Sequence, residues 1–332
     1  METVIVINMM IGARLVLAST VLLAPLALGA CGTSDERATA PSPVDAPPCP
    51  TTPVDVVVSV DQWGGIVSDL GGACANVTTL LASSSVDPHD YEPSPADVAK
   101  FEGAQLVVVN GGHYDEWAAK LAAGSAPDAP VVDAVEVSEG HDHVVVGDEE
   151  GDHDHGVNPH VWYEPAAVTG VADAVTSELS TLAPAAADYF SERRSAFGAT
   201  LEPYQRLIAS IEKSAKGKTY AATEGVFDYM AAAVGLHNKT PQGYQNAANN
   251  ESDPAPGDLD AFLSVLRDKG VDVLIYNTQT EGSVPEQLRG AADAAGVPVV
   301  EVTETVAPGA KSFEAWQVEQ LTALAKALGV PT

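Results

Sequence analysis

The sequence predicts an α/β protein with two (β/α)-type lobes, each built on a parallel sheet, joined by one long rigid helix and separated by a ligand cleft. Short runs rich in Val, Leu and Ile alternate with helical patterns from residue 54, and the same alternation returns after residue 217. Continuous apolar runs separated by helices are typical of parallel strands that are buried on both faces. The stretch between them, 165–216, is helical and shows no strand pattern.

The first lobe is expected over residues 54–164. Ser94 and Pro95 are expected to begin a helix there, because Ser is a preferred N-cap and Pro suits the first helical turn. The predicted strands are 54–60, 76–81 and 105–110, the predicted helices are 61–72, 95–104 and 114–124, and the run 130–137 continues the alternation.

The linking segment, 165–216, carries an apolar stripe whose members recur at steps of three, four and seven residues, as on one face of a helix. Pro203 interrupts the stripe and is expected to bend the helix. A helix of about 28 residues spans about 40 Å, enough to run the height of both lobes. The stripe consists of Phe190, Phe197, Leu201, Tyr204, Ile208 and Ile211.

The second lobe is expected over residues 217–332, with the same alternation of strands and helices as the first. The polar stretch 242–258 is interpreted as a surface loop. The predicted strands are 219–223, 271–277 and 297–303, and the predicted helices are 226–235, 258–270, 285–296 and 312–329.

The N-terminal residues 1–30 are interpreted as a lipoprotein signal peptide, because Arg14 is followed by an apolar run that ends in small residues. The sequence LGAC, which ends at Cys31, resembles a bacterial lipobox. This resemblance implies cleavage before Cys31 and a lipid on its thiol, which would anchor the chain to the outer face of the cytoplasmic membrane. The alternative, an uncleaved spanning helix, is disfavoured because the run is short for a span.

Residues 31–53 are rich in Pro, Ser, Thr and Ala and are interpreted as a flexible tether. Two further cysteines, Cys49 and Cys74, remain in the chain. In an exported protein an even pair favours a disulfide over two free thiols.

The net charge of −30 arises from 46 acidic residues against 16 basic ones. Such a field repels nucleic acid and anionic membrane surfaces and attracts cations, so we expect no nucleic-acid partner. The alternative explanation of the charge is solubility alone.

Four candidate metal ligands lie in loops or turns that follow predicted strands. They are His89, His160, Glu224 and Glu281. Each alone is also consistent with an exposed loop histidine or an ordinary acid at a helix start or in a turn. Ligands of α/β proteins gather at the carboxyl ends of strands, and these four come from both lobes. Together they predict a metal site in the cleft.

Histidine is otherwise scarce, with 8 in the chain, yet four lie in the acidic tract 141–155. These are His141, His143, His153 and His155. We interpret the tract as an auxiliary metal-binding loop, and the alternative is a solvated acidic loop.

The motifs PHDYEPSP, NPHVW and TEGVFDYM, with the His-rich tract between the first two, resemble the metal-binding (zinc and manganese) substrate-binding lipoproteins of bacterial ABC transporters. The resemblance covers about residues 54–330. It implies an ion bound between the lobes by His89, His160 and Glu224, with Glu281 as the last acid. It also implies delivery of the transported Zn²⁺ or Mn²⁺ to a membrane permease and its ATPase. We expect a monomer without enzymatic activity.

Two histidines and two carboxylates suit Zn²⁺ and also Mn²⁺, which prefers more oxygen ligands. Glu224 stands where zinc members usually carry a histidine, whereas the His-rich tract resembles that of zinc members. Zinc is therefore the favoured ion, and manganese uptake by the same mechanism is the alternative.

Three other functions remain as alternatives. A zinc hydrolase would use the same ligand types, but the chain lacks HExxH, and Glu281 would close the coordination. A surface metal scavenger or an adhesin would not need a transporter. A siderophore or corrinoid receptor would need an aromatic or Arg-lined cleft, which the 6% aromatic content disfavours.

Overall fold

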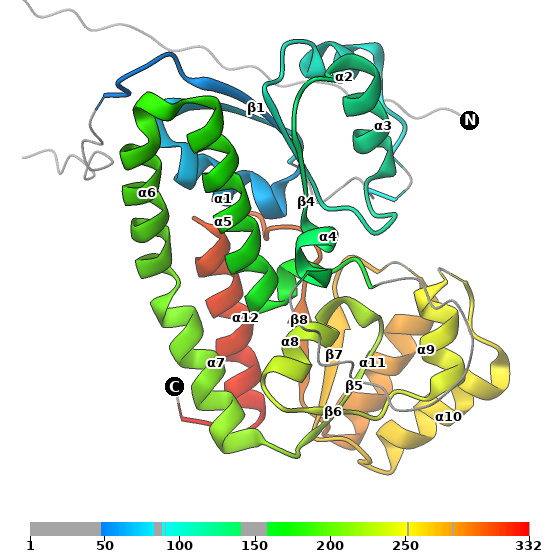
Figure 1. Ribbon diagram of the computed structural model, residues 1–332. Coiled ribbons are helices and arrows are strands. Elements are labelled where there is room, and N and C mark those ends of the chain that lie inside the picture. Colours follow the sequence, from blue (N-terminus) through cyan, green and yellow to red (C-terminus); the bar gives the residue numbers. More distant parts are fainter. Residues whose placement is uncertain are drawn as a thin grey trace, which may run out of the picture. The chain divides into compact units, whose positions relative to one another are not determined.

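The computed structural model describes residues 48–82, 88–89, 91–140, 158–250, 252–280 and 282–331 (Figure 1). Two four-stranded parallel sheets with flanking helices confirm the predicted α/β class. Within the described ranges, no helix is both long enough and apolar enough to cross a membrane.

The first sheet has the strand order β2-β1-β3-β4, and all its pairs are parallel. Helix α1 packs on β1 and β2, and α5 packs on β3 and β4. Six of the seven residues of β1 are buried, as expected for a strand covered on both faces. The strands are β1 Val54–Val60, β2 Ala75–Leu81, β3 Leu106–Val109 and β4 Val131–Asp133, and the first helices are α1 Asp61–Gly71, α2 Pro95–Phe101, α3 Glu116–Ser125 and α4 Ala134–Glu139.

Local capping explains two boundaries in this half. The Asp97 carboxylate accepts from the backbone N–H of Ser94 at 2.9 Å and from its hydroxyl at 2.6 Å, so helix α2 begins where predicted. Only the start of the run 130–137 is a strand. The Asp133 side chain accepts from the backbone N–H of Glu136 at 3.0 Å, which caps α4 and turns the rest of the run into a helix.

The second sheet has the order β6-β5-β7-β8, again all parallel. Helix α11 packs on β7 and β8, α12 on β8 and α8 on β6. The strands are β5 Thr219–Ala222, β6 His237–Asn238, β7 Val273–Asn277 and β8 Val299–Val302, and the helices are α8 Asp228–Ala233, α9 Gln242–Asn249, α10 Pro256–Arg267, α11 Ser283–Ala295 and α12 Phe313–Ala327.

The predicted surface loop 242–258 is wrong over its first half. Residues Gln242–Asn249 form helix α9, and Tyr244 is buried in that helix. The Tyr244 ring packs edge-on against Phe262 of α10 with ring centroids 4.7 Å apart. A single aromatic anchor in a polar segment therefore fixes the helix through tertiary contact.

Three helices form the linking segment, α5 Pro165–Leu182, α6 Ala187–Thr200 and α7 Glu202–Ala215 (Figure 1). Helices α6 and α7 follow each other with a break only at Leu201, whose φ of −75° and ψ of −11° remain helical in type. Pro203 lacks an N–H and its ring crowds the preceding turn, which explains the break. Helix α6 packs on α1 and helix α7 packs on α12. The consecutive helices α6 and α7 therefore contact helices of both halves.

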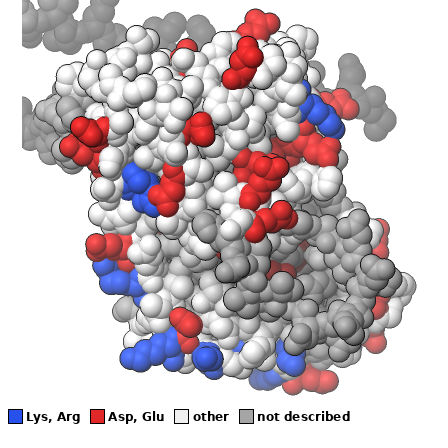
Figure 2. All heavy atoms as spheres, in the orientation of Figure 1, with Lys and Arg blue, Asp and Glu red and all other residues white. Residues whose placement is uncertain are grey.

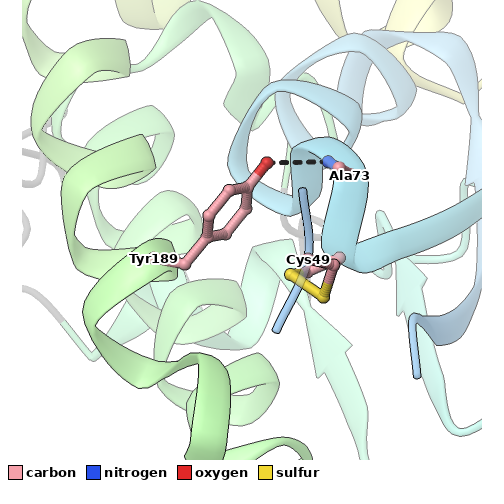
Figure 3. Close-up of a disulfide and its surroundings, with 4 residues drawn as sticks. Cys49, Ala73 and Tyr189 are labelled. Atoms are coloured by element: carbon pink, nitrogen blue, oxygen red, sulfur yellow. Dashed lines mark hydrogen bonds between the residues drawn. A yellow bond between two sulfur atoms is a disulfide. The ribbon is translucent and has the colours of Figure 1, made fainter. Parts of the chain in front are cut away.

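A disulfide joins Cys49 and Cys74, with their Cα atoms 5.0 Å apart (Figure 3). Cys74 ends the turn Gly72–Cys74 that follows α1. The backbone N–H of Ala73 donates to the Tyr189 hydroxyl of α6 at 2.8 Å (Figure 3). The disulfide therefore connects the end of the predicted tether to the turn that Tyr189 of α6 contacts.

Candidate metal site

His160 lies in the loop before the short 3-10 helix Val161–Tyr163, and its side chain is 13% exposed. Asn158 holds it at two points. The backbone N–H of His160 donates to Asn158 Oδ1 at 3.0 Å, and its Nδ1 atom lies 2.6 Å from the same oxygen. The other ring nitrogen, Nε2, lies 2.8 Å from Oε1 of Glu304. Metal-binding histidines commonly use one ring nitrogen for the ion and hold the other by a hydrogen bond to a nearby oxygen. The His160 ring, between the Asn158 amide and the Glu304 carboxylate, has this arrangement.

Glu304 follows β8 of the second sheet, and its side chain is 17% exposed. Its backbone oxygen accepts from Gln62 Nε2 of α1 at 3.0 Å, which holds this loop against the first half. Burial raises the pKa of the Glu304 carboxyl. The hydrogen bond from His160 and the electrostatic effect of His160 and His89 outweigh burial and leave this pKa below its ordinary value.

Glu224 follows β5, immediately before the 3-10 helix Gly225–Phe227. Asn277, at the end of β7, donates from Nδ2 to Glu224 Oε2 at 2.6 Å. Burial raises the pKa of the Glu224 carboxyl, and the Glu304 charge adds to the rise, although Asn277 and His160 oppose it. A raised pKa indicates a carboxylate that gains from a neighbouring cation.

His89 lies beyond the end of β2, and its ring packs edge-on against Tyr114 with centroids 4.7 Å apart. The backbone oxygen of Pro88 accepts from the Trp117 indole N–H at 3.1 Å. The Tyr114 ring also stands 6.1 Å from the His160 ring, so one buried aromatic side chain contacts His89 and neighbours His160.

The turn before Tyr114 is fixed by a buried carboxylate. Asp115 accepts from the backbone N–H groups of Asn110 at 2.7 Å and Gly111 at 2.8 Å. Gly111 has a φ of +81°, and a Cβ there would lie 2.1 Å from Asp133 Oδ1, so the turn requires glycine. Asn110 also donates to the Pro159 oxygen at 2.9 Å and thereby ties the His160 loop to the first sheet.

The structure brings His160 into contact with Glu304, and Glu304 also interacts electrostatically with His89 and Glu224. Among the residues that the structure describes, no three His, Cys, Asp or Glu side chains are spaced to coordinate one ion. Two ligand atoms at about 2.1 Å from a tetrahedral Zn²⁺ lie about 3.4 Å apart. The 2.8 Å contact of His160 with Glu304 must therefore widen for an ion to enter.

Glu304 is the candidate that sequence reasoning missed. It follows the predicted strand 297–303, so its position at a strand end was a usable signal. The predicted ligand Glu281 lies outside the described residues, as do Cys31 and the histidines of the tract 141–155.

Acidic side chains are prominent on one face of the molecule. Figure 2 shows Asp and Glu side chains over the upper part of the face in view and Lys and Arg mainly along its lower edge. With a net charge of −30, the chain attracts cations over a range that salt screens.

Curated relatives of this chain are named for zinc and for manganese. The high-affinity zinc uptake system protein ZnuA of Bacillus subtilis is 25% identical over 269 residues, which cover 79% of this chain and 81% of that protein. The zinc-binding lipoprotein AdcA of Streptococcus pneumoniae is 30% identical over 50% of this chain and 34% of its own length. The manganese-binding lipoprotein MntA of Halalkalibacterium halodurans is 22% identical over 69% of this chain and 72% of its own length.

Solved structures share the fold. The periplasmic zinc binding protein TroA from Treponema pallidum superposes with a TM-score of 0.66 at 19% identity and covers 84% of this chain and 99% of its own. The solute-binding protein FpvC from Pseudomonas aeruginosa, in complex with Mn²⁺, gives a TM-score of 0.65 at 21% identity over 84% and 99%.

The family model described as zinc-uptake complex component A, periplasmic, matches residues 56–327. That range contains both sheets except the first two residues of β1, and it contains the linking helices and all the candidate ligands of the described residues. The chain therefore belongs to the periplasmic zinc-uptake component A (ZnuA) family.

Proposed function

We propose that this protein captures a divalent transition metal outside the cytoplasm and holds it with His89, His160, Glu224 and Glu304 until it is delivered to an ABC-type permease. Glu304 replaces Glu281 as the fourth ligand in this proposal. The observation that best supports this proposal is the contact of His160 Nε2 with Glu304 Oε1 at 2.8 Å, because it pairs two ligand types from loops far apart in the sequence.

Two imidazoles and two carboxylates favour Zn²⁺ as the cargo. Tetrahedral zinc accepts this donor set, and in most nitrogen and oxygen sites zinc binds more tightly than manganese. Family membership and the zinc-named relatives support the same choice. Manganese remains the second candidate because Glu224 adds an oxygen ligand and one relative is named for manganese.

Capture breaks no covalent bond, so we propose a transport role without enzymatic activity. The permease and its ATPase are the proposed partners, and the protein acts as a monomer. A lipid on Cys31 would keep the chain at the outer face of the membrane. Cys31→Ala is expected to release the protein from the membrane fraction, and continued membrane association would contradict the lipid anchor.

The function is tested by competition between the protein and a chelator of known affinity. The chain beginning at residue 32 is stripped of metal and offered Zn²⁺ or Mn²⁺. We expect one tight equivalent of Zn²⁺ and at least about tenfold weaker binding by His160→Ala or His89→Ala. Comparable affinity for Mn²⁺ would assign the protein to manganese uptake.

A second form that lacks residues 141–155 separates the candidate site from the His-rich tract. Retention of the tight equivalent in this form supports the four-ligand site. Loss of tight binding on removal of the tract alone would overturn the proposal, as would wild-type affinity in His160→Ala.

A further inference from the structure

The Asn158 carboxamide connects the two halves of the candidate site. Its Oδ1 atom accepts from the His160 backbone N–H at 3.0 Å and lies 2.6 Å from His160 Nδ1. Its Nδ2 atom donates to the backbone oxygen of Gly225 at 2.8 Å, next to Glu224. One side chain thus contacts a proposed ligand of one loop and the backbone beside a proposed ligand of another.

Two backbone partners fix which way this carboxamide points. The His160 N–H can only donate and the Gly225 oxygen can only accept, so Oδ1 faces His160 and Nδ2 faces Gly225. His160 Nδ1 therefore meets an acceptor and must carry a hydrogen. In the metal-free protein His160 Nε2 shares a hydrogen with Glu304, and loss of that hydrogen leaves Nε2 to bind an ion while Nδ1 keeps its own.

The backbone around Asn158 is held by residues of both halves of the chain as well. Its own carbonyl accepts from the Tyr229 hydroxyl of α8 at 3.0 Å. The next residue, Pro159, accepts from Asn110 at the end of β3 at 2.9 Å. A shift of the Gly225 loop relative to the first sheet must therefore strain or break a contact of this segment.

We propose that Asn158 is a positioning residue for metal capture: it sets the tautomer of His160 and links the movement of the His160 and Glu224 loops. This inference rests on the proposed function. It gives the Asn158 carboxamide two separable tasks. In the acceptor task Oδ1 holds the His160 ring, and in the donor task Nδ2 holds the Gly225 carbonyl.

Two substitutions separate these tasks. Asn158→Ala removes both. Asn158→Asp keeps an acceptor for the His160 ring and replaces the donor with an oxygen that repels the Gly225 carbonyl. Asn76→Ala is the matched control, because Asn76 also uses its carboxamide, donating to Asp55 at 2.8 Å, but lies on exposed β2.

The first measurement is the ¹⁵N spectrum of the His160 ring in the metal-free protein in mildly alkaline buffer. We expect a hydrogen on Nδ1 in the wild type, in Asn158→Asp and in the control, and its loss from Nδ1 in a large fraction of Asn158→Ala, where Glu304 alone holds the ring through Nε2. A wild-type ring signal in Asn158→Ala, or loss of the Nδ1 hydrogen in Asn158→Asp, would overturn the acceptor task.

The second measurement is Zn²⁺ affinity and release rate against a chelator. We expect Asn158→Ala to bind about 10–100-fold more weakly, as removal of an outer-shell partner does. Asn158→Asp is expected to release Zn²⁺ faster than the wild type, and an unchanged rate would overturn the donor task. If His160→Ala itself binds normally, the proposed site fails, while the ring spectrum still decides what Asn158 does.

Discussion

His160 Nε2 and Glu304 Oε1 lie 2.8 Å apart although 144 residues separate them in the sequence. Both side chains are mostly buried, so the contact is a shielded interaction between an imidazole and a carboxylate. A metal ion would take the place of the shared hydrogen, because deprotonated ligands are the ones that bind metals. The contact joins the loop before α5 to the loop after β8 at the proposed metal site.

Glu304→Gln is expected to weaken Zn²⁺ binding by at least about tenfold, because an amide replaces a charged ligand next to His160. Glu281→Gln, at the acid that the sequence pattern favoured, is the matched comparison and is expected to bind normally. Chelator competition measures both. The opposite pattern, with loss in Glu281→Gln and retention in Glu304→Gln, would return the fourth ligand to Glu281.

Asn277→Ala is expected to lower Zn²⁺ affinity by about 10–100-fold, because it removes the donor that holds Glu224 Oε2 at 2.6 Å. Asn277→Asp is expected to weaken binding too, since its carboxylate would repel Glu224, although it keeps the acceptor that Gln279 N–H uses at 3.0 Å. Asn238→Ala, an exposed residue of β6, serves as the control. Normal affinity in Asn277→Ala would show that Glu224 does not need this donor.

Joint replacement of Cys49 and Cys74 by Ser is expected to lower the free energy of unfolding by about 3 kcal/mol, because a closed loop of this size restricts the unfolded chain. Their sequence separation is 25 residues. Thermal unfolding with and without reductant measures the effect. The wild type should lose stability in reductant and the double variant should not. A wild type that is insensitive to reductant would contradict a stabilising disulfide.

Asp61→Asn is expected to flatten the pH dependence of stability. Burial raises the pKa of the Asp61 carboxyl from 3.8 to about 6, against an opposing backbone hydrogen bond from Val306. A carboxyl whose pKa is higher in the folded than in the unfolded protein stabilises the fold while it is protonated. Its contribution to the free energy of unfolding is complete below about pH 4 and is lost as pH rises through about 6. Across this pH window the free energy of unfolding of the wild type should therefore fall by up to about 3 kcal/mol more than that of the variant.

Denaturant unfolding at several pH values tests the Asp61 prediction, with exposed Asp188→Asn as the control. The difference between wild type and variant is the quantity of interest, since other buried carboxyls titrate in the same window. Asp133 and Asp228 also have pKa values raised by burial to about 6. Parallel curves for the wild type and Asp61→Asn would contradict the assignment.

Much of the fold was predictable because its signals are local. Val54–Val60 is a valine-rich run interrupted only by Asp55 and Ser59, and such a run suits a strand covered on both faces. Ser94 and Pro95 mark a helix start through short-range hydrogen bonding and a fixed φ angle. Helix α9 was missed because its apolar face consists only of Tyr244, Ala247 and Ala248 in a polar segment, and the packing of Tyr244 on Phe262 fixes it.

The candidate site was predictable in part for the same reason. His89, His160 and Glu224 stand in strand-end loops next to Pro or at a strand–helix junction, and these features are visible in the sequence. The fourth acid was ambiguous, because Glu281 and Glu304 both follow predicted strands of the second sheet. Strand-end position alone does not say which loop faces His160.

The sequence by itself determined the α/β class, the helical link and three of the proposed ligands, because periodicity, capping and loop chemistry act over a few residues. The tertiary structure alone decided that Glu304 meets His160 and that Asn158 points its oxygen at the ring. These contacts depend on how two sheets, separate in sequence, are held by α12 against α7 and by Gln62 against the Glu304 backbone. Packing over such sequence distances is set by the whole fold, which no local pattern encodes.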